Sequence, residues 1–229
     1  MMIAQYIAVA LVGYLIGSIP FGLMISRSRT GTDIRQVGSG KIGTTNVLRT
    51  AGKKAAALVL VLDMAKGAVP VIVAELIFEG SHVVWYGEGL LWTTRVAQVL
   101  AALAAIAGHS WSIFLKFKGG RGVATSIGGL LAMCWPAAVL GGAFMIIVGS
   151  ATRYMSLGSI IGAVAAFIML IAFTILQPYH LAYAFYTMIC AIFIFAMHRD
   201  NIMRLVTGRE RKLGEKVETD NLPSSSNHK

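Results

Sequence analysis

The stretch VATSIGGLLAMCWPAAVLGGAFMIIVGS, residues 123–150, decides the fold of this chain. It carries no charged residue and is long enough for one membrane-spanning helix, which needs about 20 mostly apolar residues. Its middle holds the pair Trp135-Pro136, and a proline inside a helix removes a backbone hydrogen bond and bends or ends the helix. The stretch therefore predicts either a single span or two short helices that turn at this pair.

The whole chain is apolar to a degree that soluble domains are not. Of its 229 residues, 56% are hydrophobic and 13% are charged, and the mean hydropathy is +0.72. A soluble domain carries about 25% charged residues, so the composition predicts one all-α, polytopic membrane domain. The two cysteines, Cys134 and Cys190, lie inside apolar runs, which argues against a disulfide framework and against a metal site. We expect neither a metal nor a cofactor.

The distribution of basic residues chooses between the two interpretations of residues 123–150. The net charge is +10, and nearly all of the 20 Lys and Arg residues lie in four places: 26–54, 109–122, Arg153 and the tail from His198. Cytoplasmic segments are enriched in Lys and Arg, so this clustering indicates membrane topology before nucleic-acid binding. If residues 123–150 crossed once, Arg153 and the tail would face away from the other clusters. If the chain turns at Trp135-Pro136 and returns, every cluster faces the cytoplasm.

We therefore predict seven transmembrane helices, with the N-terminus outside and the C-terminus in the cytoplasm. The expected spans are residues 3–25, 55–78, 93–108, the two halves of 123–150, 157–176 and 179–197. Each half of 123–150, at about 14 residues, reaches only about 21 Å, which is short for a hydrocarbon core of about 30 Å. A five-span protein in which this pair does not cross is the alternative. The seven-span domain is expected over residues 1–212, and a flexible cytoplasmic tail over 213–229.

The loop 26–54 contains VGSGKIGTTNVLRTAGKK, residues 37–54, in which glycines alternate with hydroxyl, amide and cationic side chains. Glycine lets backbone N–H groups approach an anion closely, and the planar guanidinium of Arg49 matches phosphate oxygens. These residues favour a phosphate-binding loop. An ordinary basic loop with turn glycines is the other interpretation, and composition alone leaves it open.

The segment GHSWSIFLKFKGGRGVATS, residues 108–126, repeats this chemistry. Three glycines surround Arg121, and Thr125 and Ser126 open the next helix, whose N-terminus attracts anions. No Gly-Lys-Ser/Thr occurs here, so the segment does not match a nucleotide-binding P-loop. His109 can donate to a phosphate or carbonyl oxygen or carry a proton, although a structural role is commoner for a histidine at this place.

Three further places carry polar residues. RYMSLGSI, residues 153–160, puts Ser156 at the start of a span, where helix capping explains it equally well. HRDNIMRLVTGRERK, residues 198–212, is a basic amphipathic stretch after the last span, which is typical of contact with anionic lipid. Asp63 and Lys66 lie three residues apart inside the second span and share one helical face, so we interpret them mainly as a structural ion pair.

Absent motifs narrow the chemistry further. No histidine is followed by aspartate in the H-x-x-x-x-D pattern of many acyltransferases, and acidic residues are too sparse for a two-metal phosphotransfer site. No Ser/His/Asp order suggests a hydrolase. What remains is a cytoplasmic rim with two phosphate-like sites. That rim suits a reaction between two anionic substrates, one of which carries a chain that lies in the bilayer.

Taken together, residues 37–54, 108–126, 153–160 and 198–210 resemble the bacterial membrane glycerol-3-phosphate acyltransferases of the PlsY type, in order and in spacing. The resemblance implies an inner-membrane protein of seven spans with a cytoplasmic active site. It implies transfer of a fatty acyl group from acyl phosphate to the 1-hydroxyl of glycerol 3-phosphate. The products would be lysophosphatidic acid and phosphate, in the first step of phospholipid synthesis. The implied partners are the lipid bilayer and the soluble enzyme that makes acyl phosphate, and no nucleic acid.

The resemblance also implies roles for the matching residues. The expected catalytic residues are Ser39, Arg49 and His109. The residues expected to bind acyl phosphate are Gly119, Gly120, Arg121, Gly122 and Thr125. The residues expected to bind glycerol 3-phosphate are Asn46, Arg49, Ser156, Asn201 and Glu210. Two positions depart from the commonest family pattern, because Arg121 stands where lysine is usual and Lys41 where asparagine is frequent.

Three other interpretations stay open at this point. A transporter for an organic phosphate would place its site near the bilayer midplane, with broken helices and often with internal repeats. Here the polar residues gather on one rim, and the sequence shows no repeat. A lipid-binding scaffold without catalytic activity gives no reason for two glycine-rich donor segments. An acyltransferase that uses a thioester donor fits the same residues.

Overall fold

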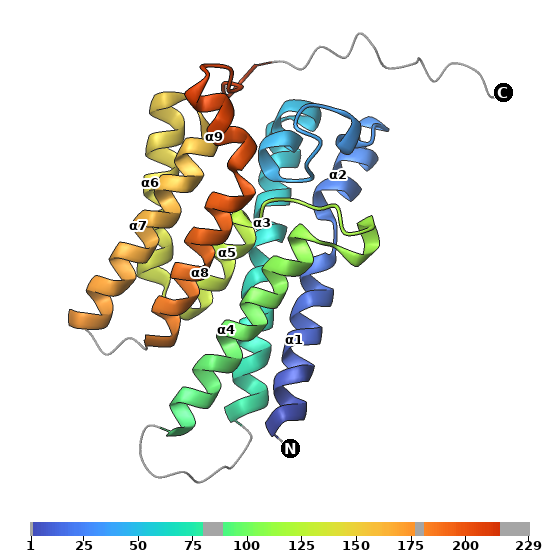
Figure 1. Cartoon of the computed structure of the whole chain (residues 1–229). Coiled ribbons are helices and arrows are strands. Elements are labelled where there is room, and N and C mark those ends of the chain that lie inside the picture. The colour runs from blue at the N-terminus through green and yellow to red at the C-terminus, as the bar shows by residue number, and fades with distance from the viewer. Residues whose placement is uncertain (1, 80–88, 177–180, 216–229) are drawn as a thin grey trace, which may run out of the picture.

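The computed structural model describes residues 2–79, 89–176 and 181–215, and every regular element in these ranges is helical (Figure 1). This confirms the all-α class for the described residues. The elements in chain order are α1 (Met2–Ser18), α2 (Phe21–Thr30), η1 (Ile34–Gln36), α3 (Thr44–Glu79), α4 (Gly89–Ser110), η2 (Ile113–Leu115), α5 (Val123–Met133), α6 (Trp135–Thr152), α7 (Met155–Leu176), α8 (Leu181–Met197) and α9 (Arg199–Val206).

The stretch 123–150 forms two helices, α5 and α6, which confirms the turn at Trp135-Pro136. Cys134 separates them with a non-helical backbone (φ −153°, ψ 82°). Pro136 lies in the first turn of α6, where its missing N–H has no helical partner to lose. The expected equal halves are wrong, however, because α5 has 11 residues and α6 has 18. Helix α5 ends at Met133, before the proline pair. Helix α6 begins at Trp135 and continues to Thr152, beyond the stretch 123–150.

Fewer helices are long enough to span a membrane than the sequence predicted. Five helical segments among the described residues are long and apolar enough to cross a membrane, or six if α8 and α9, bent by 59°, form one span. Helix α5 falls short of that length and reaches only about 16 Å at 1.5 Å per residue. Seven spans therefore remain a prediction, as does the orientation of the chain in the membrane.

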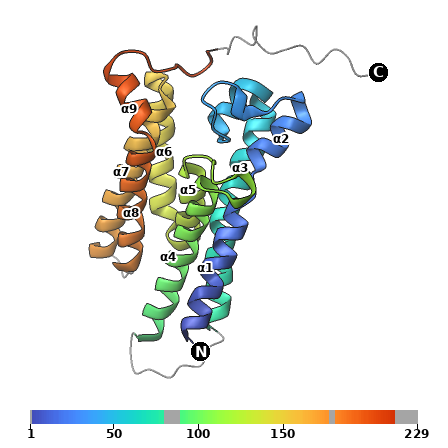
Figure 2. The same cartoon turned by 45° about the vertical axis from the view of Figure 1, so that its right-hand side comes forward.

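The bundle consists of two helical groups joined by α5. Helix α1 packs against α3 and α4, while α6 packs against α7 and α7 against α8. Helix α5 contacts α3 on one side and α6 on the other, and Figure 2 shows it between the two groups. A Cβ on Gly67 would collide with the carbonyl oxygen of Thr125, so this glycine allows α3 and α5 to approach closely, as small residues do between membrane helices.

The loop predicted over residues 26–54 is shorter than expected, which corrects the second span. Pro20 separates α1 from α2, which continues as a helix to Thr30 and ends at Gly31 in the left-handed conformation. Helix α3 begins at Thr44 instead of Ala55, and is interrupted at Gly52. Residues 44–51 thus form a short helical segment where the sequence suggested loop. The polar residues of this segment hid its helical character, because the Asn46 side chain is buried and bonds to carbonyls of the preceding loop.

The basic segments lie at one end of the molecule, opposite the N-terminus (Figure 1). Arg153 Nη2 donates to the Leu213 carbonyl, and Leu213 N donates to the Arg153 carbonyl at 2.7 Å. Arg211 Nη1 donates to the Gly38 carbonyl at 2.7 Å. This arrangement agrees with the return of the chain between α5 and α6. The domain boundary at residue 212 remains a prediction, and residues 216–229 of the expected tail lie outside the described residues.

Candidate active site

Two cavities lie side by side among the polar residues at this end of the bundle. The smaller, of about 50 Å³, is lined mainly by polar side chains, among them Arg49, Arg121, Ser156, Asn201, Arg204 and Glu210. The larger, of about 230 Å³, extends from polar residues such as Ser39 and His109 to apolar residues of α5 and α6 such as Ile127 and Met145. The two share a wall, which includes Ser39, Thr45, Arg121, Ser159 and His198.

A third cavity lies next to the larger one, in the apolar interior. Its volume is about 40 Å³, and it lies between α5, α6, α7 and α8. Val123, Ile127, Met145 and Ser159 line both this cavity and the larger one. The larger cavity therefore shares a wall with an apolar one, and α5 contributes to that wall.

Arg49 and Arg121 both line the smaller cavity, and each has a donor without a hydrogen-bond partner among the described residues. They come from separate elements, the start of α3 and the turn before α5. The Nε atom of each is buried and has no hydrogen-bond partner among the described residues. Burial lowers the pKa of the Arg121 guanidinium from its ordinary value, as does the nearby positive charge of Arg204. Two arginines with unsatisfied buried donors predict an anion in the smaller cavity.

Glu210 organises the opposite wall of the smaller cavity. Ser156 Oγ donates to its Oε1 at 2.8 Å and Asn201 Nδ2 donates to the same oxygen at 2.6 Å. Arg204 Nε donates to Oε2 at 2.9 Å, and only 6% of the Glu210 side chain is exposed. Burial raises the pKa of this carboxyl, but the hydrogen bonds from Asn201, Ser156 and Arg204 lower it more, so it lies below its ordinary value. Both carboxylate oxygens of Glu210 therefore accept hydrogen bonds, and the group orients three donors.

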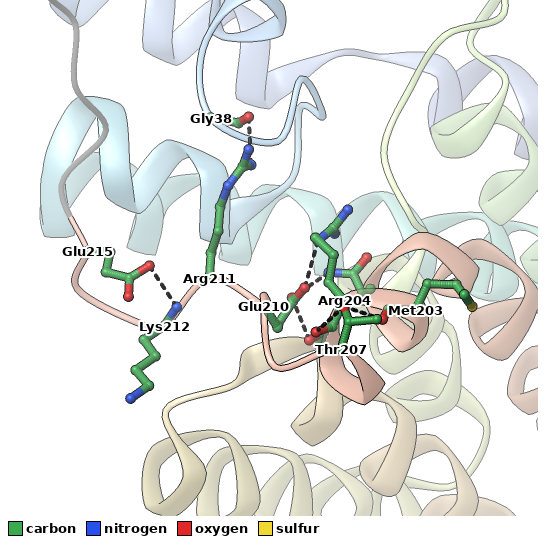
Figure 3. A network of polar contacts seen from close by, with 10 residues as sticks. Gly38, Met203, Arg204, Thr207, Glu210, Arg211, Lys212 and Glu215 are labelled. Carbon is green, nitrogen blue, oxygen red and sulfur yellow. Dashed lines mark hydrogen bonds and ion pairs between the residues drawn. The ribbon is translucent and has the colours of Figure 1, made fainter.

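The segment that carries Glu210 crosses over the smaller cavity, which Glu210 and Arg211 line. After α9 the chain crosses to the loop before α3, where Arg211 reaches the Gly38 carbonyl (Figure 3). The side chain of Glu215 accepts a hydrogen bond from the Lys212 backbone further along the same segment. Residues 209–215 thus tie the two helical groups together over the cavities.

Replacing Glu210 with glutamine is expected to lower stability by about 1.5–3 kcal/mol at neutral pH, because hydrogen bonds to a charged group are lost. The folded-state pKa is depressed, so the charged form contributes stability above the ordinary value of 4.5. That contribution disappears as the pH falls through the lowered value. Melting curves of the wild type and of Glu210→Gln should therefore differ at pH 7 and converge in acid.

The matched control for this prediction is Glu215→Gln. Glu215 lies in the same segment, and its carboxylate is exposed and accepts one backbone hydrogen bond. This variant should melt close to the wild type at every pH. A gap between wild type and Glu210→Gln that stays constant down to pH 3 would contradict the assigned charge of Glu210.

Asn46, expected to bind substrate, is committed to the protein backbone. Its Nδ2 donates to the carbonyls of Ile34, Val37 and Lys41 at 2.9–3.1 Å, and its Oδ1 accepts from Ser39 N at 3.2 Å. The side chain is buried. Asn46 therefore folds the loop before α3 around the short segment 44–51, and places Ser39 where it lines both cavities.

His109 and the turn after it form a compact unit. Gly119 N donates to the Ser110 carbonyl and Gly120 N to the His109 carbonyl, each at 3.0 Å. A Cβ on Gly120 would collide with the imidazole Nε2 of His109, so only glycine allows this close packing. The turn ends at Gly122, which has a φ of 78° and precedes α5. These two N–H groups are thus occupied, and the turn presents Arg121 to both cavities.

The ion pair of Asp63 and Lys66 joins this unit, in agreement with the structural role that we inferred. Lys66 Nζ lies 2.8 Å from Asp63 Oδ1, and the side chains are each 1% exposed. Lys66 Nζ also donates to the Ile19 carbonyl at the break between α1 and α2, at 3.0 Å. His109 Nδ1 lies 3.8 Å from the same Asp63 oxygen, and Asp63 lines the larger cavity. The pair thus connects three elements beneath the site.

The structure brings most of the expected site residues together. Those that line the smaller cavity are Ser39, Arg49, Arg121, Ser156, Asn201 and Glu210, and those that line the larger one are Ser39, Asn46, His109, Arg121 and Gly122. Gly119, Gly120 and Thr125 line neither. Lining residues to which we gave no role include Thr45, His198 and Arg204, and Asp63, which we expected only in an ion pair, also lines the larger cavity. The spacing of His198, Asn201 and Arg204, each three residues apart, was the available signal for one face of α9.

No group of three or more His, Cys, Asp or Glu side chains in the described part of the chain is arranged to hold a metal ion. The side chains that line the smaller cavity include cationic, hydroxyl and amide donors. The imidazole of His109 lies in the wall of the larger cavity.

Comparisons with known proteins agree on one family. Residues 7–208 match the family model of glycerol-3-phosphate acyltransferase. A curated glycerol-3-phosphate acyltransferase 3 of Dehalococcoides mccartyi (strain CBDB1) is 48% identical over 217 residues, which cover 95% of this chain and 100% of that protein. The glycerol-3-phosphate acyltransferase of Gluconobacter oxydans (strain 621H) is 38% identical over 213 residues, which cover 92% and 94%.

The fold is also that of solved structures of PlsY, an integral membrane glycerol 3-phosphate acyltransferase. The glycerol 3-phosphate form superposes with a TM-score of 0.76 at 34% identity, and covers 91% of this chain and 96% of that one. The lysophosphatidic acid form gives a TM-score of 0.75 at 33% identity, with 91% and 95% covered. The chain therefore belongs to the glycerol-3-phosphate acyltransferase family, of the PlsY type.

Proposed function

We propose that this chain transfers a fatty acyl group from acyl phosphate to the 1-hydroxyl of glycerol 3-phosphate, and releases lysophosphatidic acid and phosphate. The observation that carries the proposal is the polar cavity beside a larger, partly apolar one: in the smaller cavity, the buried Nε atoms of Arg49 and Arg121 have no hydrogen-bond partner among the described residues. Both substrates carry a phosphate, and one also carries an apolar chain. The two cavities offer matching compartments with a shared wall.

The glycerol 3-phosphate is placed in the smaller cavity. Arg49 binds its phosphate through the free guanidinium donors, and Ser156 and Asn201 lie on the facing wall, oriented by Glu210. Asn46 contributes indirectly and does not touch the substrate, because its amide holds the loop that carries Ser39. Ser39 lines both cavities and is placed where the two substrates meet.

The acyl phosphate is placed against the turn before α5. Arg121 and Gly122 hold its phosphate in the larger cavity, while Gly119 and Gly120 shape the turn through their packing on His109. Thr125 is buried at the start of α5 with an Oγ1 that has no partner, and stays a proposed contact for the same phosphate. The acyl chain extends along α5 and α6 towards the third cavity.

The reaction needs positioning and charge neutralisation more than a strong base, since acyl phosphate is already activated. The hydroxyl oxygen of glycerol 3-phosphate attacks the acyl carbonyl carbon, a new ester C–O bond forms, and the C–O bond to phosphate breaks. The hydroxyl proton passes to a phosphate oxygen. His109, in the wall of the larger cavity, is placed to polarise the carbonyl or to position the hydroxyl.

The proposed setting is the bacterial inner membrane with the site on the cytoplasmic side. The clustering of basic segments at one end of the bundle supports this, because cytoplasmic segments are rich in Lys and Arg. Contact with the soluble enzyme that makes acyl phosphate belongs to the same proposal. A site on this face would receive its donor directly from the cytoplasm.

One assay decides the donor. Purified protein is given labelled glycerol 3-phosphate with acyl phosphate, an acyl-carrier-protein thioester or acyl-CoA in turn. Lysophosphatidic acid from acyl phosphate alone is the expected result. Product from a thioester would assign a different donor, and no product from any donor would contradict the proposal.

Filling the apolar part of the larger cavity is expected to select against long acyl chains. Ile127 lines both the larger and the third cavity, so Ile127→Trp should lower kcat/KM for palmitoyl phosphate by about tenfold, or about 1.4 kcal/mol. Butyryl phosphate, whose chain is short, should lose much less. Ile161→Trp on α7 is the control, because Ile161 is 39% exposed and lines neither cavity. Equal losses for both donors in Ile127→Trp would contradict the assigned path.

A further inference from the structure

Helix α3 is interrupted at one residue, and the interruption separates the part of the helix that lines the site from the part that packs in the bundle. Gly52 has φ 82° and ψ −179°, whereas residues on both sides are helical. The segment before it, residues 44–51, lines the cavities with Thr44, Thr45, Asn46 and Arg49. The direction of this short segment therefore determines where Arg49 meets the smaller cavity.

Arg49 is not held in place by a side-chain partner. Its Nε is buried without a hydrogen bond, and no carboxylate of the described residues lies within ion-pair distance, 4.0 Å, of its guanidinium. The donors that would face it across the cavity, Ser156 and Asn201, are bound to Glu210. The position of Arg49 in the absence of substrate is thus set by the backbone that carries it.

That backbone is anchored at its beginning. Asn46 bonds to three carbonyls of the preceding loop, and Val47 is fully buried in a cluster with Ile34 and Ile42. Thr50 Oγ1 donates to the Asn46 carbonyl at 3.0 Å and completes the short helix. At its end the segment joins the rest of α3 through Gly52, and Ala51 packs against the same apolar cluster as Ala55 and Ala56 beyond the glycine.

Gly52 owes its identity to its backbone conformation alone. A Cβ added at this position would meet no heavy atom within 4 Å. The combination of positive φ with extended ψ is essentially restricted to glycine. An alanine here must rotate the backbone to a different conformation, and residues 44–51 then change direction relative to the rest of α3.

We propose that Gly52 is a positioning residue for the reaction, because its conformation sets the direction of residues 44–51 and so aims Arg49 at the smaller cavity. The inference rests on the proposed function, in which Arg49 binds the phosphate of glycerol 3-phosphate. It assigns to Gly52 a role that involves no contact with either substrate.

The first test is the kinetics of Gly52→Ala in the full chain. The KM for glycerol 3-phosphate should rise by about tenfold or more, while the KM for acyl phosphate, which is held by another element, stays within about twofold. Gly31→Ala is the matched control. Gly31 also has a positive φ, 68°, and also has no atom within 4 Å of an added Cβ, but it ends α2 and carries no cavity-lining residue. Its left-handed helical conformation (φ 68°, ψ −8°) costs alanine less than the conformation of Gly52 does, and this variant should leave both KM values unchanged.

The second test measures the direction of the segment without any turnover. The two native cysteines are first replaced, and nitroxide labels are attached at Ala51→Cys and Val206→Cys. Pulsed electron paramagnetic resonance then measures the distance from residues 44–51 to α9. The distance distribution should shift in Gly52→Ala and stay unchanged in Gly31→Ala. If the wild type is inactive with every donor, the proposed function fails and this measurement still decides whether Gly52 directs the segment.

Three outcomes would overturn the inference. An unchanged distance in Gly52→Ala would mean that the glycine does not set the direction of the segment. A shifted distance with an unchanged KM for glycerol 3-phosphate would mean that the direction does not matter for binding. An equal rise of this KM in Gly31→Ala would mean that general backbone strain is responsible.

Discussion

Replacing Arg121 with alanine is expected to lower kcat/KM for acyl phosphate by about a hundredfold, which corresponds to about 2.7 kcal/mol. The guanidinium lies in the turn directly before α5 and lines both cavities, and its buried Nε has no hydrogen-bond partner among the described residues. The change should appear mainly as a higher KM for acyl phosphate, with a smaller rise for glycerol 3-phosphate. Initial rates measured while each substrate is varied in turn separate the two.

The control for Arg121 is the conservative variant Arg121→Lys. The ammonium group of lysine keeps the positive charge and loses the planar fork of the guanidinium. This variant should recover most of the activity. Because Arg121 lines both cavities, the alternative result is clear: a KM for glycerol 3-phosphate that rises more than that for acyl phosphate would assign Arg121 to the other substrate.

Removing one partner of the buried ion pair should cause the largest loss of stability. Asp63→Asn or Lys66→Met leaves the other group buried without its counter-charge, and the expected cost is about 3–5 kcal/mol. Lys66 also bonds to the Ile19 carbonyl at the break between α1 and α2, so the loss should include the packing of α2. Unfolding in detergent with increasing denaturant measures the difference.

Two controls separate the buried pair from a general charge effect. Glu75→Gln changes a half-exposed carboxylate on the same helix, 3.8 Å from Arg95, and should cost less than about 1 kcal/mol. The double variant Asp63→Leu with Lys66→Met removes both charges and should recover most of the stability. A single variant as stable as the wild type would show that the pair does not hold these elements together.

The sequence predicted the turn between α5 and α6 because two independent constraints agreed. The proline pair made a continuous helix costly, and the basic clusters required the chain to return. The convergence of the two glycine-rich segments followed from the same argument, since both were assigned to one rim. Arg49, Arg121, Ser156 and Asn201 were thus expected together before any contact between them was known.

Proline chemistry and charge clustering could not predict that α5 and α6 differ in length, nor where α3 begins. Residues 44–51 form a helix because the Asn46 amide bonds to carbonyls of the preceding loop and because Val47 is buried among distant apolar residues. Local composition shows only a polar, glycine-containing stretch. The kink at Gly52 is likewise invisible in sequence, since a turn glycine and a helix-interrupting glycine are the same letter.

By itself, the sequence determined the membrane class, the return of the chain at Trp135-Pro136 and the residue types that meet an anion. These depend on hydropathy, proline chemistry and charge, which are local properties of the chain. Only the tertiary structure decided which of the polar residues face the cavities. It assigned Asn46, Gly119, Gly120 and Glu210 to holding the protein together, and left Arg49 and Arg121 with free donors. The physical reason is that a hydrogen-bonding group is available to a ligand only when no other group of the fold satisfies it.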